Sequence, residues 1–355
     1  MKKTTRVGKS LIAVQNELGT EEQALAFLEA LRWPDGVTCL KCNGPVSKFT
    51  TRKSTRKTPY ISKVTGQAKD HVVPVRHLYQ CLNEDCWFQF TATTGTIFNN
   101  THLPLRKWML AVAIMCNAKK GVSAKQLQRD LETSYKTAWF LAHRIREAMT
   151  LGNFCDEKMT GTIEIDETYI GGKFDKRRKR QRWDKEAVFG IIERETGRVH
   201  AKHLPGRSHL NRWQVAAEID AVVDQSAHVM TDESRLYANL ERRGFKHDIV
   251  IHSDKEWIRG ECHTQSIDSF WALLKRGVVG SFHRISIKHL DRYIQEFSYR
   301  FNNKDNQEVF GLTVAALVLG IPLPYKKLIA SVPLLSQSLR TNRFNRPLAR
   351  YCGLR

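Results

Sequence analysis

Residues 161–166 read Gly-Thr-Ile-Glu-Ile-Asp, and this short stretch decides the fold class of the chain. Its apolar residues, Ile163 and Ile165, alternate with polar ones, which is the two-residue period of a β-strand. Downstream of it, strand patterns alternate with helix patterns, and this alternation predicts an α/β domain. The other predicted elements are a hairpin over residues 187–204, a helix over 208–224, strands over 227–232 and 248–253, and helices over 264–276 and 287–302.

Three aspartates lie at the ends of predicted strands or on a predicted helix. Asp166 ends the first strand, Asp232 ends the strand over 227–232, and Asp268 lies on the helix over 264–276. Strand ends can converge at one sheet edge, where carboxylates hold two divalent ions about 3.5–4 Å apart. Mg²⁺, or Mn²⁺ in its place, takes such oxygen ligands. Any one of these aspartates taken alone is more often a cap or turn residue, so the hypothesis depends on the set.

Lys275 lies seven residues after Asp268. Seven residues are nearly two helical turns, so both side chains project from the same face of the predicted helix. A carboxylate that holds metal and a lysine that holds phosphate would serve one reaction, and we expect the neighbouring Arg276 to contact DNA. The alternative for Lys275 and its neighbour Arg276 is a solvated last turn, stabilised by the helix dipole.

Four of the eight cysteines form two close pairs, Cys39-x2-Cys42 and Cys81-x4-Cys86. Four thiolates are the usual ligand set of a closed, structural Zn²⁺ site. The 38 residues between the pairs are more than a zinc ribbon commonly has. Four unrelated buried cysteines are the alternative.

A short helix after Ser123, a turn at 132–134 and a longer helix over 135–149 match a helix-turn-helix pattern. In that motif the second helix enters the major groove of DNA. We therefore expect Lys136 and Arg144 to contact DNA. An ordinary helical hairpin gives the same pattern.

The charge of the chain points to a polyanionic partner. It has 57 Lys and Arg against 36 Asp and Glu, a net charge of +21, which favours nucleic acid. A basic run over 173–185 follows the first aspartate directly, and we expect its central residues to contact phosphates; a solvated charge run is the alternative. No apolar run is long enough for a membrane span, so a cytoplasmic protein with no membrane partner is expected. The central residues of the run are Arg177, Arg178, Lys179 and Arg180.

Three segments also carry a family resemblance: EIDETYIGGK at 164–173, TDESRLY at 231–237, and HTQSIDSFWALLKRGVVGSFHRISIKHLDRYIQEFSYRFN at 263–302. They resemble the catalytic blocks of bacterial insertion-sequence transposases of the DDE type, in the group built around insertion-sequence family 1595. The cysteine pairs resemble the N-terminal zinc ribbon of that group. The likeness covers about residues 20–320.

The resemblance implies an RNase H-like mixed-sheet core in which Asp166 and Asp232 are the first two carboxylates. A third acid is implied where Asp268 stands, 36 residues after Asp232, a spacing close to that of such enzymes. The family usually has Glu there, which is one methylene longer. Gln265, one turn earlier, is a minor candidate for the third ligand, but a neutral amide is the poorer ligand for a hard cation.

Together these patterns predict a zinc-ribbon DNA-binding region at 1–99, a helical, helix-turn-helix-like domain at 100–155, a catalytic core at 156–305, and a C-terminal helix and basic tail at 306–355. The function expected is cleavage and strand transfer of double-stranded DNA, with both the terminal repeats of an element and its target DNA as partners. A homodimer or higher oligomer is expected on the DNA. A catalytically inactive, transposase-derived DNA-binding protein and a stand-alone nuclease are the alternatives.

Overall fold

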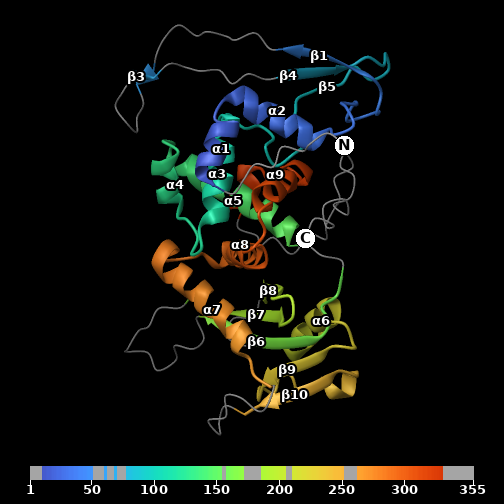
Figure 1. Ribbon diagram of the computed structural model, residues 1–355, viewed down its shortest axis with the longest axis vertical. Helices are drawn as coiled ribbons and strands as arrows, with labels where there is room; N and C mark the ends of the chain where they lie inside the picture. Colours follow the sequence, from blue (N-terminus) through green and yellow to red (C-terminus); the bar gives the residue numbers. More distant parts are fainter. Residues whose placement is uncertain are drawn as a thin grey trace. The chain divides into compact units, whose positions relative to one another are not determined.

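The computed structural model describes residues 10–50, 60–61, 68–69, 77–153, 157–171, 185–204, 210–251 and 262–330. The chain divides into two compact units, which are described one at a time (Figure 1). The discontinuous unit comprises residues 1–152 and 305–355, and the continuous unit comprises 153–304. None of the helices in the described segments is long and apolar enough to cross a membrane.

A five-stranded sheet forms the centre of the continuous unit (Figure 1). The strand order is β10-β9-β6-β7-β8. The strands β6, β7 and β8 pair antiparallel, whereas β9 and β10 lie on the other side of β6 and run parallel to it. The mixed sheet and the α/β class predicted from the alternation are confirmed. The strands are β6 (Thr162–Ile170), β7 (Glu186–Glu193), β8 (Val199–His203), β9 (His228–Asp232) and β10 (Lys246–Val250).

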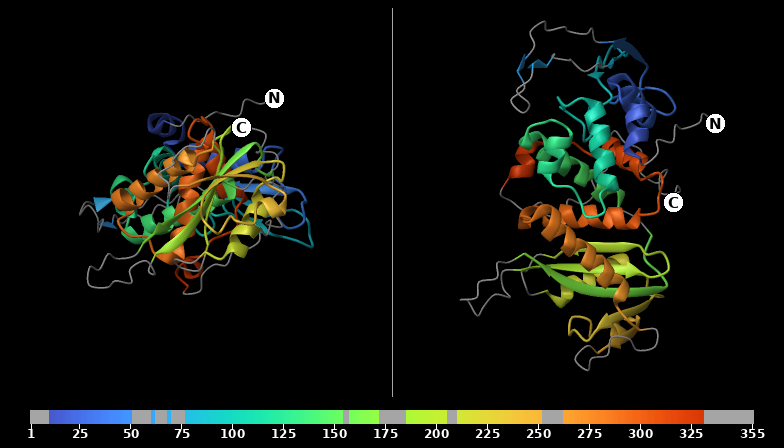
Figure 2. Two further views of the ribbon diagram at one scale, coloured as in Figure 1. Left: turned by 90° about the horizontal axis from the view of Figure 1, so that it is seen from below. Right: turned by 60° about the vertical axis from the view of Figure 1, so that its left-hand side comes forward.

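Helices cover both faces of this sheet. Successive strand residues point to opposite faces, so Ile163 and Ile165 pack with Val215 and Ile219 of α6 (Arg212–Val222). On the other face, Val188 and Ile192 of β7 join the core formed by the long helices α7 and α8. Figure 2 shows these two helices, in orange, on the same side of the strands. They are α7 (Gln265–Gly277) and α8 (Leu290–Asn302), joined by a π-helical turn (Val278–Phe282) and a 3₁₀ turn (Ile287–His289); another 3₁₀ turn (Glu241–Arg243) precedes β10.

The discontinuous unit combines a small sheet with a helical core. Its antiparallel sheet has the order β1-β4-β5, and a separate pair is β2-β3. The helix α9 is apolar on all sides and is buried among the other helices of this unit, including α5. The elements are α1 (Leu11–Leu18), α2 (Glu21–Arg32), β1 (Val46–Thr50), β2 (Tyr60–Ile61), β3 (Ala68–Lys69), β4 (His77–Cys81), β5 (Gln89–Phe90), α3 (Leu105–Asn117), α4 (Ala124–Asp130), α5 (Tyr135–Gly152), α9 (Val309–Leu319) and α10 (Tyr325–Ile329).

The sequence favours Thr20 and Ser123 as N-caps, and the structure confirms both, whereas the helix expected to begin at 208 begins at Arg212. Thr20 caps α2 and forms a capping box with Gln23, and the Ser123 hydroxyl accepts from the Gln126 N–H at the start of α4. The differences lie at other ends. The strand expected at 248–253 begins earlier, at Lys246, and α8 begins three residues later than expected, at Leu290, because a 3₁₀ turn occupies 287–289.

Candidate metal centres

Four cysteines converge at one end of the small sheet. The ligand atoms of Cys39, Cys42, Cys81 and Cys86 all lie within 4.8 Å of one another. The Sγ atoms of Cys39 and Cys86 are 3.7 Å apart, and those of Cys42 and Cys81 are 3.4 Å apart. Tetrahedral Zn–S bonds of about 2.3 Å require sulfurs about 3.8 Å apart, so this set fits a Zn²⁺ ion.

Backbone geometry prepares each cysteine pair for a metal. The N–H of Lys41 points at the Cys39 sulfur and the N–H of Asn83 at the Cys81 sulfur, each at 3.4 Å. These N–H groups favour the thiolate form, because a hydrogen bond to a charged form stabilises it. A Cβ on Gly44 would lie 3.2 Å from the Cys42 sulfur, so the first turn passes close to the ligands.

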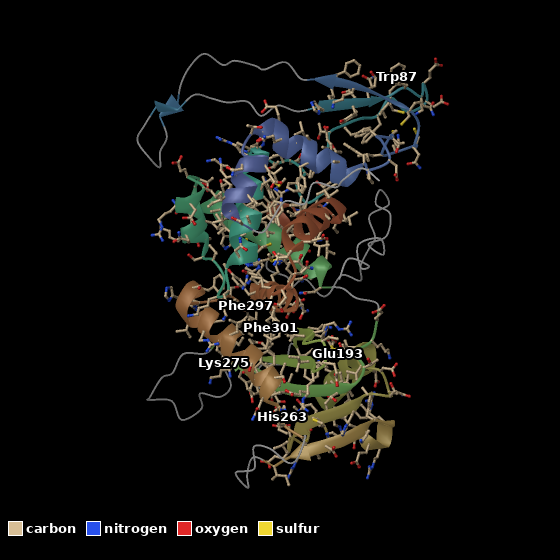
Figure 3. All side chains as sticks on the ribbon, viewed as in Figure 1. Trp87, Glu193, His263, Lys275, Phe297 and Phe301 are labelled. Atoms are coloured by element: carbon tan, nitrogen blue, oxygen red, sulfur yellow. The ribbon has the colours of Figure 1, made fainter. Side chains whose placement is uncertain are left out.

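An aromatic cluster packs against the cysteines. Trp33, Tyr79 and Phe90 pack with ring centroids 5.2–6.0 Å apart, and Tyr79 and Phe90 are almost fully buried. Trp87, labelled in Figure 3, directly follows Cys86 in the sequence but does not share this burial, since it is 56% exposed. Such a small sheet has little core of its own, so a metal and a few aromatic rings must hold it together.

The second candidate centre lies in the continuous unit, where β9 ends beside the middle of β6. Asp166 was expected to end its strand, but β6 continues to Ile170, so this prediction is corrected. β6 and β9 run parallel with Glu164 opposite Met230, so continuing the same register brings Asp166 beside Asp232. Both side chains are half-buried and project to the α7 face. The N–H of Ser234 donates to the Asp232 carboxylate at 3.0 Å and fixes its orientation.

Asp268 lies in the first turn of α7 and is exposed. It is near enough to act on the first aspartate: burial raises the pKa of Asp166 to about 7, and the negative charges of Glu167, Asp232 and Asp268 add to this shift. One Asp166 oxygen also accepts from the Trp271 indole N–H at 2.9 Å. The three predicted carboxylates therefore share one electrostatic environment.

The two centres differ in how closely their ligands converge. Within the described segments, the cysteines are the one group of three or more possible ligands that all lie within 4.8 Å of each other. The three aspartates do not form such a group.

Two buried glutamates beside Asp166 were not predicted as functional. Glu164 has no exposed surface, and Glu167 faces the α6 side, where it accepts from the buried Tyr237 hydroxyl at 2.5 Å. Burial raises the pKa of Glu167, and the charge of Asp232 contributes. The EID stretch contained the signal, since a charged residue at an inward strand position needs a partner.

The other predicted site residues on α7 are exposed. Lys275 and Arg276 occupy its last turn, and Gln265 begins it. Lys275 and Asp268 project from the same side, as the seven-residue spacing predicted, and Figure 3 shows Lys275 and His263 toward opposite ends of this helix.

The predicted DNA contacts have different outcomes. Lys136 is exposed at the start of α5. Arg144 is instead a core residue: it is 4% exposed, donates to the carbonyls of Ile97 and Asn99, and stacks on the Trp108 ring. A guanidinium held in this way does not reach a phosphate, so the sequence interpretation of Arg144 is corrected. The basic residues Arg177, Arg178, Lys179 and Arg180 lie outside the described residues.

Comparisons with known proteins bear on both centres. The model of the transposase zinc-ribbon domain matches residues 19–86, which include the four clustered cysteines. The model of the ISXO2-like transposase domain matches residues 158–302, which include the three aspartates. An uncharacterized protein in transposable element ISH50 of Halobacterium salinarum is 26% identical over 299 residues, covering 79% of this chain and 90% of that protein. The chain therefore carries, on one polypeptide, a region similar to the zinc ribbon and a region similar to the transposase domain of IS1595 insertion-sequence transposases.

Proposed function

We propose that this chain is a DDE-type DNA transposase that cleaves the ends of an insertion sequence and joins them to target DNA. The observation that carries the proposal is the crowding of Asp166 by Asp232 and Asp268 inside the matched transposase domain. Like charges gathered at a half-buried site are unfavourable unless a cation neutralises them. An all-oxygen donor set suits Mg²⁺ or Mn²⁺.

We further propose that the continuous unit is an RNase H-like core. Its strand order supports this, with an antiparallel three-stranded meander extended by two parallel strands beside the first. In this arrangement β6 is central, and its neighbour β9 ends at Asp232, beside the middle of β6 where Asp166 lies. Carboxylates on two adjacent strands are thus available to one substrate.

The chemistry proposed is two phosphoryl transfers without a covalent enzyme intermediate. Divalent ions held by the carboxylates would supply activation of the attacking oxygen and stabilisation of the leaving oxygen. Asp166, Asp232 and Asp268 are the residues that would hold these ions. Water attacks first and frees a 3′-hydroxyl, which then attacks a target phosphodiester. Lys275, exposed on the face that carries Asp268, would hold a phosphate of the substrate.

Sequence recognition is assigned to the discontinuous unit. The first residues of α5 are exposed. In a recognition helix, the residues near the start contact the base edges. Lys136 is our candidate there, and the run around Arg177–Arg180 is our candidate for phosphate contacts. Because an element has two ends, we also propose that at least two copies assemble on DNA, in the cytoplasm. The boundaries at residues 99, 155 and 305 remain part of this proposal.

The test is a strand-transfer assay with duplexes taken from the DNA that flanks the gene. In Mg²⁺, the wild type should both nick these ends and join them to a target. Nicks without joining would identify a stand-alone nuclease. No product at all, together with normal binding in a gel shift, would identify an inactive DNA-binding descendant.

A further inference from the structure

A buried carboxylate ties the start of α7 to the strand that carries Asp166. Glu164 lies on β6 two residues before Asp166, so both side chains project from the same face. Its carboxylate has no exposed surface and accepts from the N–H groups of Ser266 at 2.8 Å and Ile267 at 3.0 Å. The guanidinium of Arg194 donates to its other oxygen at 2.6 Å.

This contact replaces the cap that α7 lacks. Thr264 stands at the N-cap position but makes no side-chain hydrogen bond to the helix. The first N–H groups of a helix have no partner within it, and a negative charge there is favourable. Glu164, which lies on β6, supplies both the hydrogen-bond acceptor and the negative charge. Arg194 completes the contact by donating to the carbonyl of His263 at 2.8 Å, just before the helix.

A second tie holds the helix one turn farther on. Trp271 donates its indole N–H to Asp166 at 2.9 Å and is 2% exposed. Its ring lies over Gly190, the residue opposite Asp166 on β7, where a Cβ would come within 2.5 Å of the ring. Asp268 lies between the two ties, since Ile267 precedes it and Trp271 follows it by three residues. The two ties therefore fix the position of Asp268 along the axis of α7 and the rotation of α7 about that axis.

We propose that Glu164 is a positioning residue for the transposase centre: it docks α7 on β6 so that Asp268 faces Asp166 and Asp232 across the divalent-cation sites. This inference rests on the proposed function of the aspartates. Glu164 does not touch the cation, because both its oxygens are already bound by Arg194 and the helix. Groups that orient a metal ligand change metal affinity or activity by about 10- to 100-fold when they are altered.

The test compares two buried glutamates of the same sheet. Glu193 of β7, labelled in Figure 3, is also almost fully buried, accepts from the Thr160 N–H at 2.8 Å and lies 3.7 Å from Arg198, but it does not contact α7. E164Q and E193Q each remove one buried negative charge that accepts from a backbone N–H and lies near an arginine. Mn²⁺ affinity is measured by titration of the free Mn²⁺ signal in electron spin resonance, with zinc retained and folding verified by thermal melting.

The expected result is a rise of the Mn²⁺ dissociation constant by about 10- to 100-fold for E164Q, with that of E193Q within about twofold of wild type. Nicking by E164Q should recover in part at high Mn²⁺. If E164Q melts at a lower temperature yet binds Mn²⁺ like the wild type, Glu164 is merely structural and the inference fails. Should E164Q not fold, R194K perturbs the same tie more mildly and is judged by the same criteria.

Failure of the proposed function gives a different result. If D166N also binds Mn²⁺ normally, the aspartates are not the cation site and both proposals fall. If D166N loses Mn²⁺ binding while E164Q and R194K retain it, only the positioning role of Glu164 is overturned.

Discussion

The cysteine cluster and the aspartate cluster are two candidate metal centres built on opposite principles. Each cysteine pair lies in one tight turn, and the backbone N–H groups of that turn already point at the sulfurs. The aspartates come from two strands and a helix, and contacts between these elements, from Glu164 of β6 to the start of α7 and from Trp271 of α7 to Asp166, hold the helix in place. We expect the first centre to need its metal in order to fold, and the second to need its fold in order to bind metal.

The largest effect is expected at the aspartates. Asp166→Asn or Asp232→Asn removes a charged ligand with little change of shape, and nicking should fall at least about a thousandfold, roughly 4 kcal/mol of transition-state stabilisation. DNA binding in a gel shift and zinc content should stay normal, because the ribbon folds around its own metal. Near-normal nicking by either variant would remove these residues from the centre.

The ribbon should respond in the opposite way. Cys39→Ser or Cys81→Ser should lower the zinc content from about one ion per chain to near zero. Limited proteolysis should then cut within residues 19–86 and leave the 153–304 unit resistant, since structural zinc supplies folding energy directly. Wild type purified without chelator and free of zinc would contradict this prediction.

The third carboxylate sharpens the comparison further. Asp268→Ala should reduce nicking by about a hundredfold, and Gln265→Ala by less than about threefold, because an amide is the weaker ligand for a hard cation. Asp268→Glu should retain activity. An inactive Gln265→Ala variant beside an active Asp268→Ala variant would reverse the assignment.

The burial of Asp166, together with the negative charges beside it, predicts a pH dependence of stability in the continuous unit. The pKa of Asp166 is raised to about 7 in the folded state, above its usual value, so the native state holds this proton more tightly than the unfolded chain. That stability is fully present below the unfolded pKa and is lost as the pH rises through about 7.

Without added divalent cation, wild type should therefore lose about 2–3 kcal/mol more than Asp166→Asn between pH 5 and pH 8. Urea unfolding with zinc retained measures the difference, and Mg²⁺ at pH 8 should restore wild type alone. Parallel profiles for the two proteins would mean that the fold does not raise the pKa of Asp166.

The smallest expected effect concerns packing. Gly190→Ala places a Cβ within 2.5 Å of the Trp271 ring and should cost about 1–3 kcal/mol of stability, because the ring must shift. Nicking should fall more than that loss of folded protein explains, since the indole also holds Asp166. Gly197→Ala in the β7–β8 turn is the control for a loss of stability without a steric clash, because its φ of +69° strains an alanine while no atom lies within 4 Å of the added Cβ.

What the sequence predicted follows the same division. Thr20 and Ser123 cap helices within their own turns, and the cysteine pairs lie within theirs, so local patterns were sufficient. Glu164 binds a helix 102 residues away, and no local pattern marks that contact. Arg144 had the appearance of a surface residue because the carbonyls that bind it belong to a loop 45–47 residues earlier. Position on a helix was predictable, but the burial of that face was not.

Because α7 is capped from β6, the order in which the chain folds is constrained. A 13-residue helix without a local cap is marginal by itself, so α7 should become stable only after β6 and β7 offer it a surface. Chain synthesis delivers Asp166 and Asp232 long before Asp268 and Trp271. We therefore expect a nascent chain to pass through a stage in which the sheet is formed and the third acid is not yet seated. The proposed DNA-cutting centre would thus be completed last, when α7 docks on a sheet that is already formed.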